Sequence, residues 1–116
     1  MNLSEIVTRL GLENLTPQTP LAGREVAGGH VSDLLSDVLA NAPRQGLLVT
    51  IQVHLNVLAV AAHAGLAAVV FAAGRQPEES VRARAVEEGI PLLGSRAAAF
   101  DVVGELYALG IKGRHA

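Results

Sequence analysis

Residues 46–73 read GLLVTIQVHLNVLAVAAHAGLAAVVFAA, and this stretch decides the fold class of the chain. Aliphatic clusters at 47–51 and 67–71 predict two strands. Between them, residues 55–64 are apolar on almost every side and predict a helix that ends at Gly65. A buried β-α-β unit gives such a near-continuous apolar sequence, because parallel strands are covered on both faces.

The same stretch is long enough to be tested as a membrane span, since it contains no Asp, Glu, Lys or Arg. It fails the test because Gly65 breaks the run and four polar side chains interrupt it, namely Gln52, His54, Asn56 and His63. We therefore expect no membrane-spanning segment and no membrane partner. The first ten residues include Glu5 and Arg9 and have no apolar core, so we expect no signal peptide.

Outside this unit, helix and strand patterns alternate along the chain. Helices with an apolar stripe or a terminating glycine are expected at 3–10, 31–42, 76–88 and 95–109, the last with Ser95 as its N-cap. Strands are expected at 24–27 and 90–93, a sharp turn at Gly28-Gly29, and an irregular segment or short edge strand within 12–22. This order predicts a three-layer α/β/α fold with a mostly parallel sheet of four to five strands and alternating crossover helices.

The composition excludes several classes of protein. With 116 residues the chain is long enough for one domain, expected at 1–111 and followed by a frayed tail at 112–116. The absence of cysteine excludes a disulfide framework, a thiolate metal site and a cysteine nucleophile, and it fits a reducing, cytoplasmic location. A formal charge of −2 gives no electrostatic footprint for nucleic acid.

Candidate binding residues follow the expected strands. In a parallel sheet, ligands collect outside the carboxyl ends of the strands, where loops converge and helix N-termini present amide hydrogens. Four segments are expected to meet there, at 28–33, 52–56, 72–76 and 94–96. Their small or hydrogen-bonding members are the predicted ligand-binding residues: Gly28, Gly29, His30, Ser32, Asp33, Gln52, His54, Asn56, Gly74, Arg75 and Ser95.

Simpler interpretations compete with a binding role for several polar residues. Gly28-Gly29 lacks the later glycine and downstream acid of a dinucleotide fingerprint, and no phosphate-loop motif exists, so turn chemistry is favoured. Asp33 and Asp37 are one helical turn apart but have no evident third ligand, so a solvated helix face is favoured over a metal site. No cofactor motif is found. His63 is expected to pack or cap, and His115 lies in the tail.

Gln52, His54 and Asn56 are three polar residues in an otherwise apolar run. Buried polar groups cost roughly 1 to 3 kcal/mol each unless they are paired. The sequence leaves three kinds of partner open: a ligand, another loop, or a symmetry mate.

The chain resembles a stand-alone DRTGG domain. The resemblance rests on VAGGHVSDLLSDV at 26–38, TIQVHLN at 50–56, GRQP at 74–77 and EGIPLL at 88–93. Related domains lie at the N-terminus of HPr kinase/phosphorylase, within long phosphotransacetylases and between CBS domains of some pyrophosphatases, which implies an accessory, regulatory role. Where the family name's Asp-Arg-Thr and Gly-Gly fall, this chain has Val53-His54-Leu55 and Ala73-Gly74, so the groups that would bind an anion most directly are missing.

Together these features lead to one expected function and two rivals. We expect a non-enzymatic regulatory or ligand-sensing domain, acting as a homodimer and binding a small anionic ligand such as a nucleotide at the strand C-termini. The first rival is a protein-protein interaction or dimerisation module without a small ligand, with a partner protein in a redox or metabolic system. The second is a small enzyme that uses His54 as general base, oriented by Asp33.

Overall fold

The computed structural model describes residues 1–114, and the apolar stretch forms the centre of its sheet. As the sequence predicts, it folds into β3 (Gly46–Thr50), α3 (Asn56–Ala64) and β4 (Ala68–Phe71). All residues of both strands are buried. Gly65 ends α3 in the left-handed conformation, at φ 65°.

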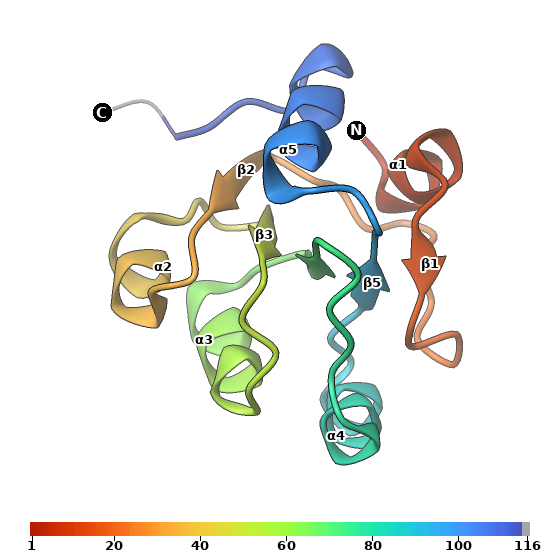
Figure 1. Cartoon of the computed structure of the whole chain (residues 1–116), viewed down its shortest axis with the longest axis vertical. Helices are drawn as coiled ribbons and strands as arrows, with labels where there is room; N and C mark the ends of the chain where they lie inside the picture. Colours follow the sequence, from red (N-terminus) through yellow and green to blue (C-terminus); the bar gives the residue numbers. More distant parts are fainter. Residues whose placement is uncertain (115–116) are drawn as a thin grey trace.

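The sheet has five strands in the order β1-β5-β4-β3-β2 (Figure 1). The other three strands are β1 (Glu13–Asn14), β2 (Gly28–Val31) and β5 (Leu92–Gly94). Strands β2, β3, β4 and β5 pair in parallel, and β1 pairs with β5 antiparallel at the edge. The expected mostly parallel sheet and the short edge strand within 12–22 are therefore confirmed.

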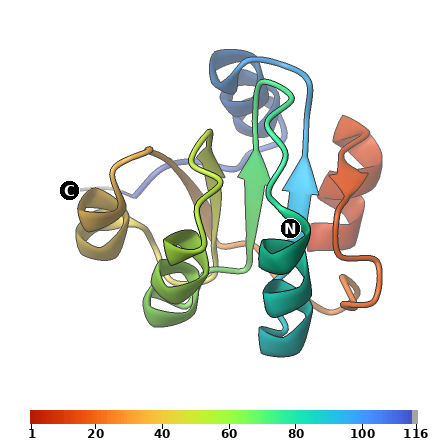
Figure 2. The ribbon, with the colours of Figure 1, turned by 60° about the horizontal axis from the view of Figure 1, so that its bottom comes forward.

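Helices cover both faces of the sheet (Figures 1 and 2). One face carries α1 (Leu3–Leu10) and α5 (Ala99–Ala108), whose Ile6, Val102 and Leu106 pack with Val49 of β3. The opposite face carries α2 (Leu35–Asn41), α3 and α4 (Glu79–Glu88), against Leu48. This confirms the three-layer α/β/α prediction. No helix within residues 1–114 is both long and apolar enough to cross a membrane.

The first parallel strand lies four residues later than predicted. The sequence predicts a strand at 24–27 and a turn at Gly28-Gly29, whereas both glycines begin β2. Residues 24–27 instead meet the N-terminus: Glu25 forms an isolated bridge with Asn2, and the Val26 N–H donates to the Met1 carbonyl at 2.9 Å. Because β2 extends to Val31, α2 also begins later than predicted, at Leu35 and not at residue 31.

The last described residues lie against the outer edge of β2 (Figure 1). The Gly29 N–H donates to the Lys112 carbonyl at 2.9 Å, and Arg114 Nη1 donates to the Ala40 carbonyl at 3.2 Å. The prediction of a frayed tail is therefore wrong for residues 112–114, because this segment supplies a backbone partner to an edge strand. His115 and Ala116 lie outside the described residues.

Candidate functional site

Asp33 joins the loop after β2 to the carboxyl end of β3. Its Oδ1 accepts hydrogen bonds from Thr50 Oγ1 and from the Ile51 N–H, each at 2.8 Å. Thr50 is buried, so its hydroxyl needs such a partner. The expected place of Asp33 on a solvated helix face is wrong, because α2 begins two residues later and leaves the carboxylate free to bridge two strands.

Gln52, His54 and Asn56 follow β3 and are linked by local hydrogen bonds. Gln52 Oε1 accepts from the His54 N–H at 3.2 Å, and His54 Nδ1 accepts from the Asn56 N–H at 3.1 Å. His54 and Asn56 are exposed and Gln52 is half-buried. The premise that all three groups are buried is therefore wrong, and backbone N–H groups two residues along the chain donate to the Gln52 and His54 side chains. Contact of this trio with a ligand stays a prediction.

The described hydrogen bonds of Asp33 and His54 do not connect the two side chains. Asp33 is engaged by Thr50 and Ile51, and the imidazole of His54 is engaged by its own loop. An orienting carboxylate must accept a hydrogen bond from the histidine that acts as base. The geometry does not support this pair.

His30, within β2, forms a polar cluster with two side chains of α2. Its Nε2 lies 2.8 Å from Asp37 Oδ2, and Asn41 Nδ2 donates to Asp37 Oδ1 at 2.7 Å. The hydrogen bond from Asn41, followed by those from His30 and Ser32, lowers the pKa of Asp37 from 3.8 to about 2. Asp37 therefore positions His30. Within residues 1–114, no group of three or more His, Asp or Glu side chains is placed to hold a metal ion.

Two of the predicted binding glycines lie away from the carboxyl edge of the sheet. Gly28 pairs with Gly46, the first residue of β3, which places it at the amino end of the strands. A Cβ added at Gly28 would lie 3.0 Å from the Lys112 carbonyl oxygen, so close packing explains this glycine. Gly29 pairs with Leu47, the second residue of β3, and its N–H donates to the same Lys112 carbonyl. Ser32 is beyond the strand, where its Oγ accepts from the Leu34 N–H at 3.1 Å.

The loops after β4 and β5 are joined by their backbones. Ala73 and Gly74 both have left-handed conformations, at φ 57° and 69°. This turns the Ala73 N–H to the Ala97 carbonyl at 2.7 Å and the Gly74 N–H to the Ser95 carbonyl at 2.9 Å. The predicted meeting of Gly74 and Ser95 is therefore found. The neighbouring Arg75 is exposed.

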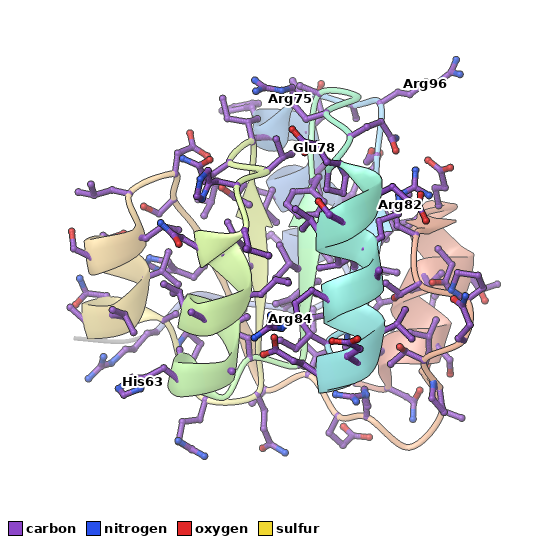
Figure 3. The ribbon with its side chains drawn as sticks, turned by 90° about the horizontal axis from the view of Figure 1, so that it is seen from below. His63, Arg75, Glu78, Arg82, Arg84 and Arg96 are labelled. Atoms are coloured by element: carbon purple, nitrogen blue, oxygen red, sulfur yellow. The ribbon has the colours of Figure 1, made fainter. Side chains whose placement is uncertain are left out.

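A crevice of about 680 Å³ opens beside these joined loops. We call it the glycine crevice; it is lined by Gly11, Glu13, Gly74, Gln76, Gly94, Ser95 and Arg96. Figure 3 shows Arg75 and Arg96 extending from this end of the molecule, while the exposed His63, expected to pack or cap, lies at the opposite end. Of these lining residues the sequence predicts only Gly74 and Ser95 as binding residues, and it misses Gly11, Glu13, Gln76, Gly94 and Arg96. Gln76 and Arg96 lie within the loop segments that the sequence identified, whereas Glu13 comes from the antiparallel edge strand.

Gln76 is held in one wall of the crevice from both sides. Its Nε2 donates to Glu13 Oε1 at 3.3 Å, and its Oε1 accepts from Arg82 Nη2 of α4 at 3.4 Å. Glu13 thus brings a negative charge to this wall, and the guanidinium of Arg96 brings a positive charge to the crevice.

The helices that begin at the carboxyl edge lack side-chain N-caps. None of α2, α3, α4 and α5 has a hydrogen bond from its N-cap side chain, whereas Asn2 caps α1 by accepting from the Ser4 N–H at 2.9 Å. The predicted cap by Ser95 is wrong, because α5 begins later and Ser95 Oγ accepts from the Ala97 N–H at 3.2 Å. At α3, the His54 side chain accepts from the Asn56 N–H, which is the first of that helix. Helices α4 and α5 follow the loops after β4 and β5, so their amide donors and positive dipole ends face the edge where the crevice lies.

A second cavity, of about 650 Å³, lies along the outer edge of β2. We call it the β2 pocket; its lining comes from β2, β3, α2, α5 and residues 111–114. Of the predicted binding residues it contains only Gly29 and His30. Sequence reasoning missed the remainder because it depends on the end of the chain returning to β2.

Comparison with known proteins places the fold. No family model matches the sequence, and no curated protein matches it. The structure is similar to the CBS and DRTGG domains of the regulatory region of Clostridium perfringens pyrophosphatase, with a TM-score of 0.67 and 11% sequence identity. The chain has a DRTGG-like fold. This agrees with the resemblance read from the sequence.

The match covers most of this chain but less than half of the pyrophosphatase region. It covers 89% of this chain, so the DRTGG-like fold spans almost all of it, but only 44% of the pyrophosphatase region. That region was crystallised with an activator, diadenosine tetraphosphate. The likeness therefore establishes a fold that occurs in a regulatory region.

Proposed function

We propose that this chain is a non-enzymatic, ligand-sensing regulatory domain that binds a small anion such as a nucleotide at the carboxyl ends of its strands. The observation that carries the proposal is the glycine crevice. Gly11 and Gly74 are exposed and have no atom within 4 Å of an added Cβ, so they let a ligand approach the backbone, and Ser95 and Arg96 supply a hydroxyl and a cation. Similarity to a regulatory region crystallised with a nucleotide activator supports the same class of ligand.

The anion is expected on the side of the crevice that carries Arg96, with Arg75 close to its mouth. Glu13 also lines the crevice and repels a negative ligand. The neutral variant Glu13→Gln should therefore bind the anion several-fold more tightly, whereas loss of both arginines should weaken binding. Removal of the negative charge and removal of the positive charges should therefore change the affinity for the anion in opposite directions.

Thermal shift and calorimetry with inorganic phosphate, AMP, ATP and diadenosine tetraphosphate test the ligand. A ligand at about 100 times its Kd raises the free energy of unfolding by about 2.7 kcal/mol. We expect Arg75→Gln/Arg96→Gln to weaken binding at least tenfold and the control Arg9→Gln, whose arginine lies on α1, to leave it unchanged. No stabilisation by any of these anions at millimolar concentration, or equal affinity of the double variant, would overturn the proposal.

We further propose that the domain is a homodimer formed through α5. Phe100 and Tyr107 are 87% and 58% exposed although aromatic rings are scarce in this chain. Gly104 lies between them, at the i, i+4, i+7 spacing of one helix face, and nothing lies within 4 Å of a Cβ added there. Two copies would bring four rings together, roughly 600–1,000 Å² of area, toward the roughly 1,200–2,000 Å² of a stable interface.

Light scattering tests the dimer. The chain should have the mass of two copies at micromolar concentration, Phe100→Asp should reduce it to one, and the control Leu39→Asp, an exposed leucine on α2, should not. A monomeric wild-type chain contradicts the dimer. If such a monomer also binds none of the anions but recovers a stoichiometric partner from a cytoplasmic extract, the interaction-module alternative replaces both proposals.

A further inference from the structure

The β2 pocket has a largely apolar wall. Val49 of β3, Val103 and Leu106 of α5 and Ile111 line it, and Tyr107 stands at its rim. Its volume of about 650 Å³ lies within the range of small-molecule sites, which are mostly apolar with a few placed polar groups. The pocket shares no lining residue with the glycine crevice.

Two cations stand at the same pocket. Lys112 Nζ lies 5.6 Å from the centroid of the Tyr107 ring, and Arg114 donates to the Ala40 carbonyl. Within residues 1–114, neither forms an ion pair with a carboxylate. The hydrogen bond from the Gly29 N–H to the Lys112 carbonyl fixes the backbone that carries the lysine.

The acidic group of the pocket is already engaged. Asp37 accepts at Oδ1 from Asn41 and lies 2.8 Å through Oδ2 from His30 Nε2, so both carboxylate oxygens have partners within α2 and β2. Hydrogen bonding leaves this carboxylate charged, so it offsets one of the two terminal cations. The two terminal cations leave an excess of positive charge beside an apolar wall.

We propose that the β2 pocket is a second ligand site, for a small amphipathic anion that carries a flat apolar ring and a single acidic group. The ring lies against Val103 and Leu106, and the acidic group faces Lys112 and Arg114. An uncharged apolar ring would make no ion pair with the two cations, and an inorganic anion would make no apolar contact with the wall. The site is separate from the crevice, so it does not depend on the proposed nucleotide binding.

Titration of the isotopically labelled full chain, followed by amide NMR shifts, tests the proposal. The probe is 2-naphthalenesulfonate, compared with 2-naphthalenemethanol, which lacks the charge, and methanesulfonate, which lacks the ring. We expect saturable shifts at Gly29, Val31 and Lys112, and about tenfold weaker binding of each comparison compound.

Matched variants separate this site from the crevice. Lys112→Gln/Arg114→Gln changes only exposed side chains and should weaken naphthalenesulfonate binding about tenfold, whereas Arg75→Gln/Arg96→Gln should leave it unchanged. ATP shifts at residues 74–76 and 94–96 report the crevice independently in the same spectra. Three results would each overturn the second site: shifts without saturation, shifts centred on the crevice, or less than a twofold effect of the Lys112/Arg114 variant.

Discussion

The two halves of the sheet's carboxyl edge are built from similar residues and reach different outcomes. After β2 and β3, the side chains of Asp33 and Gln52 accept hydrogen bonds from neighbouring hydroxyl and N–H groups. After β4 and β5, Ala73 and Gly74 join the loops through the backbone, and Arg75 remains exposed. We call the half after β2 and β3 the closed half, because its side chains hold its loops, and the half after β4 and β5 the open half. In the open half the backbone joins the loops, so its polar side chains stay available for the proposed ligand.

The largest effect is expected from breaking the closed half at Asp33. Asp33→Ala leaves the buried Thr50 hydroxyl and the Ile51 N–H without their acceptor. The free energy of unfolding should fall by about 1–3 kcal/mol, measured by urea denaturation. The control Asp101→Ala removes an exposed carboxylate from the first turn of α5 and should cost less than about 1 kcal/mol. Equal losses would mean that Asp33 does not join the two loops.

A smaller change in the free energy of unfolding is expected at Gly74 of the open half, with the opposite sign at Gly104 of α5 as its control. An added Cβ meets nothing within 4 Å at Gly74 or at Gly104, but Gly74 has φ +69° and Gly104 is helical. Gly74→Ala should destabilise by about 1 kcal/mol, and Gly104→Ala should stabilise by about 0.5–1 kcal/mol. Both variants belong in the Phe100→Asp chain, so that the proposed dimer does not contribute. Changes of the same sign would show that backbone conformation does not hold the open loops.

Asp37, on α2 beside β2, gives the stability of the fold a pH dependence. Its pKa is lowered from 3.8 to about 2 in the folded chain by its hydrogen bonds from Asn41 and His30, so the folded state releases this proton more readily than the unfolded state. The resulting stability is complete above about pH 5 and declines as pH falls from about 4 to 2. The stability difference between wild type and Asp37→Asn should shrink over that interval in acid-dependent urea denaturation. A difference that stays constant down to pH 2 contradicts the lowered pKa.

The centre of the fold is predictable because burial on two faces leaves a strong pattern. Residues 46–73 have that pattern, and their strands and helix follow it closely. The β2 edge is less predictable because distant pairings decide it. Glu25 bridges to Asn2, and the strand forms at Gly28–Val31 instead of at 24–27. A pairing between residues so far apart in sequence cannot be inferred from local propensity.

The candidate sites divide in the same way. The meeting of Gly74 and Ser95 follows from loop positions in a parallel sheet, so the sequence sufficed to predict it. Glu13 enters the crevice only because β1 pairs antiparallel with β5. Lys112 reaches the β2 pocket only because the chain returns to Gly29, which no periodicity signals.

The smallest effect is expected at His54, and it tests the comparison most directly. His54→Ala removes an exposed acceptor from the Asn56 N–H, a group that water can serve, so the free energy of unfolding should change by about 0.5 kcal/mol or less. If the closed half is structural, ATP affinity in calorimetry should also stay within twofold of wild type, while Arg75→Gln/Arg96→Gln weakens it. A tenfold loss of ATP affinity in His54→Ala would reverse this assignment, because a side chain engaged by its own backbone would then also contact the ligand.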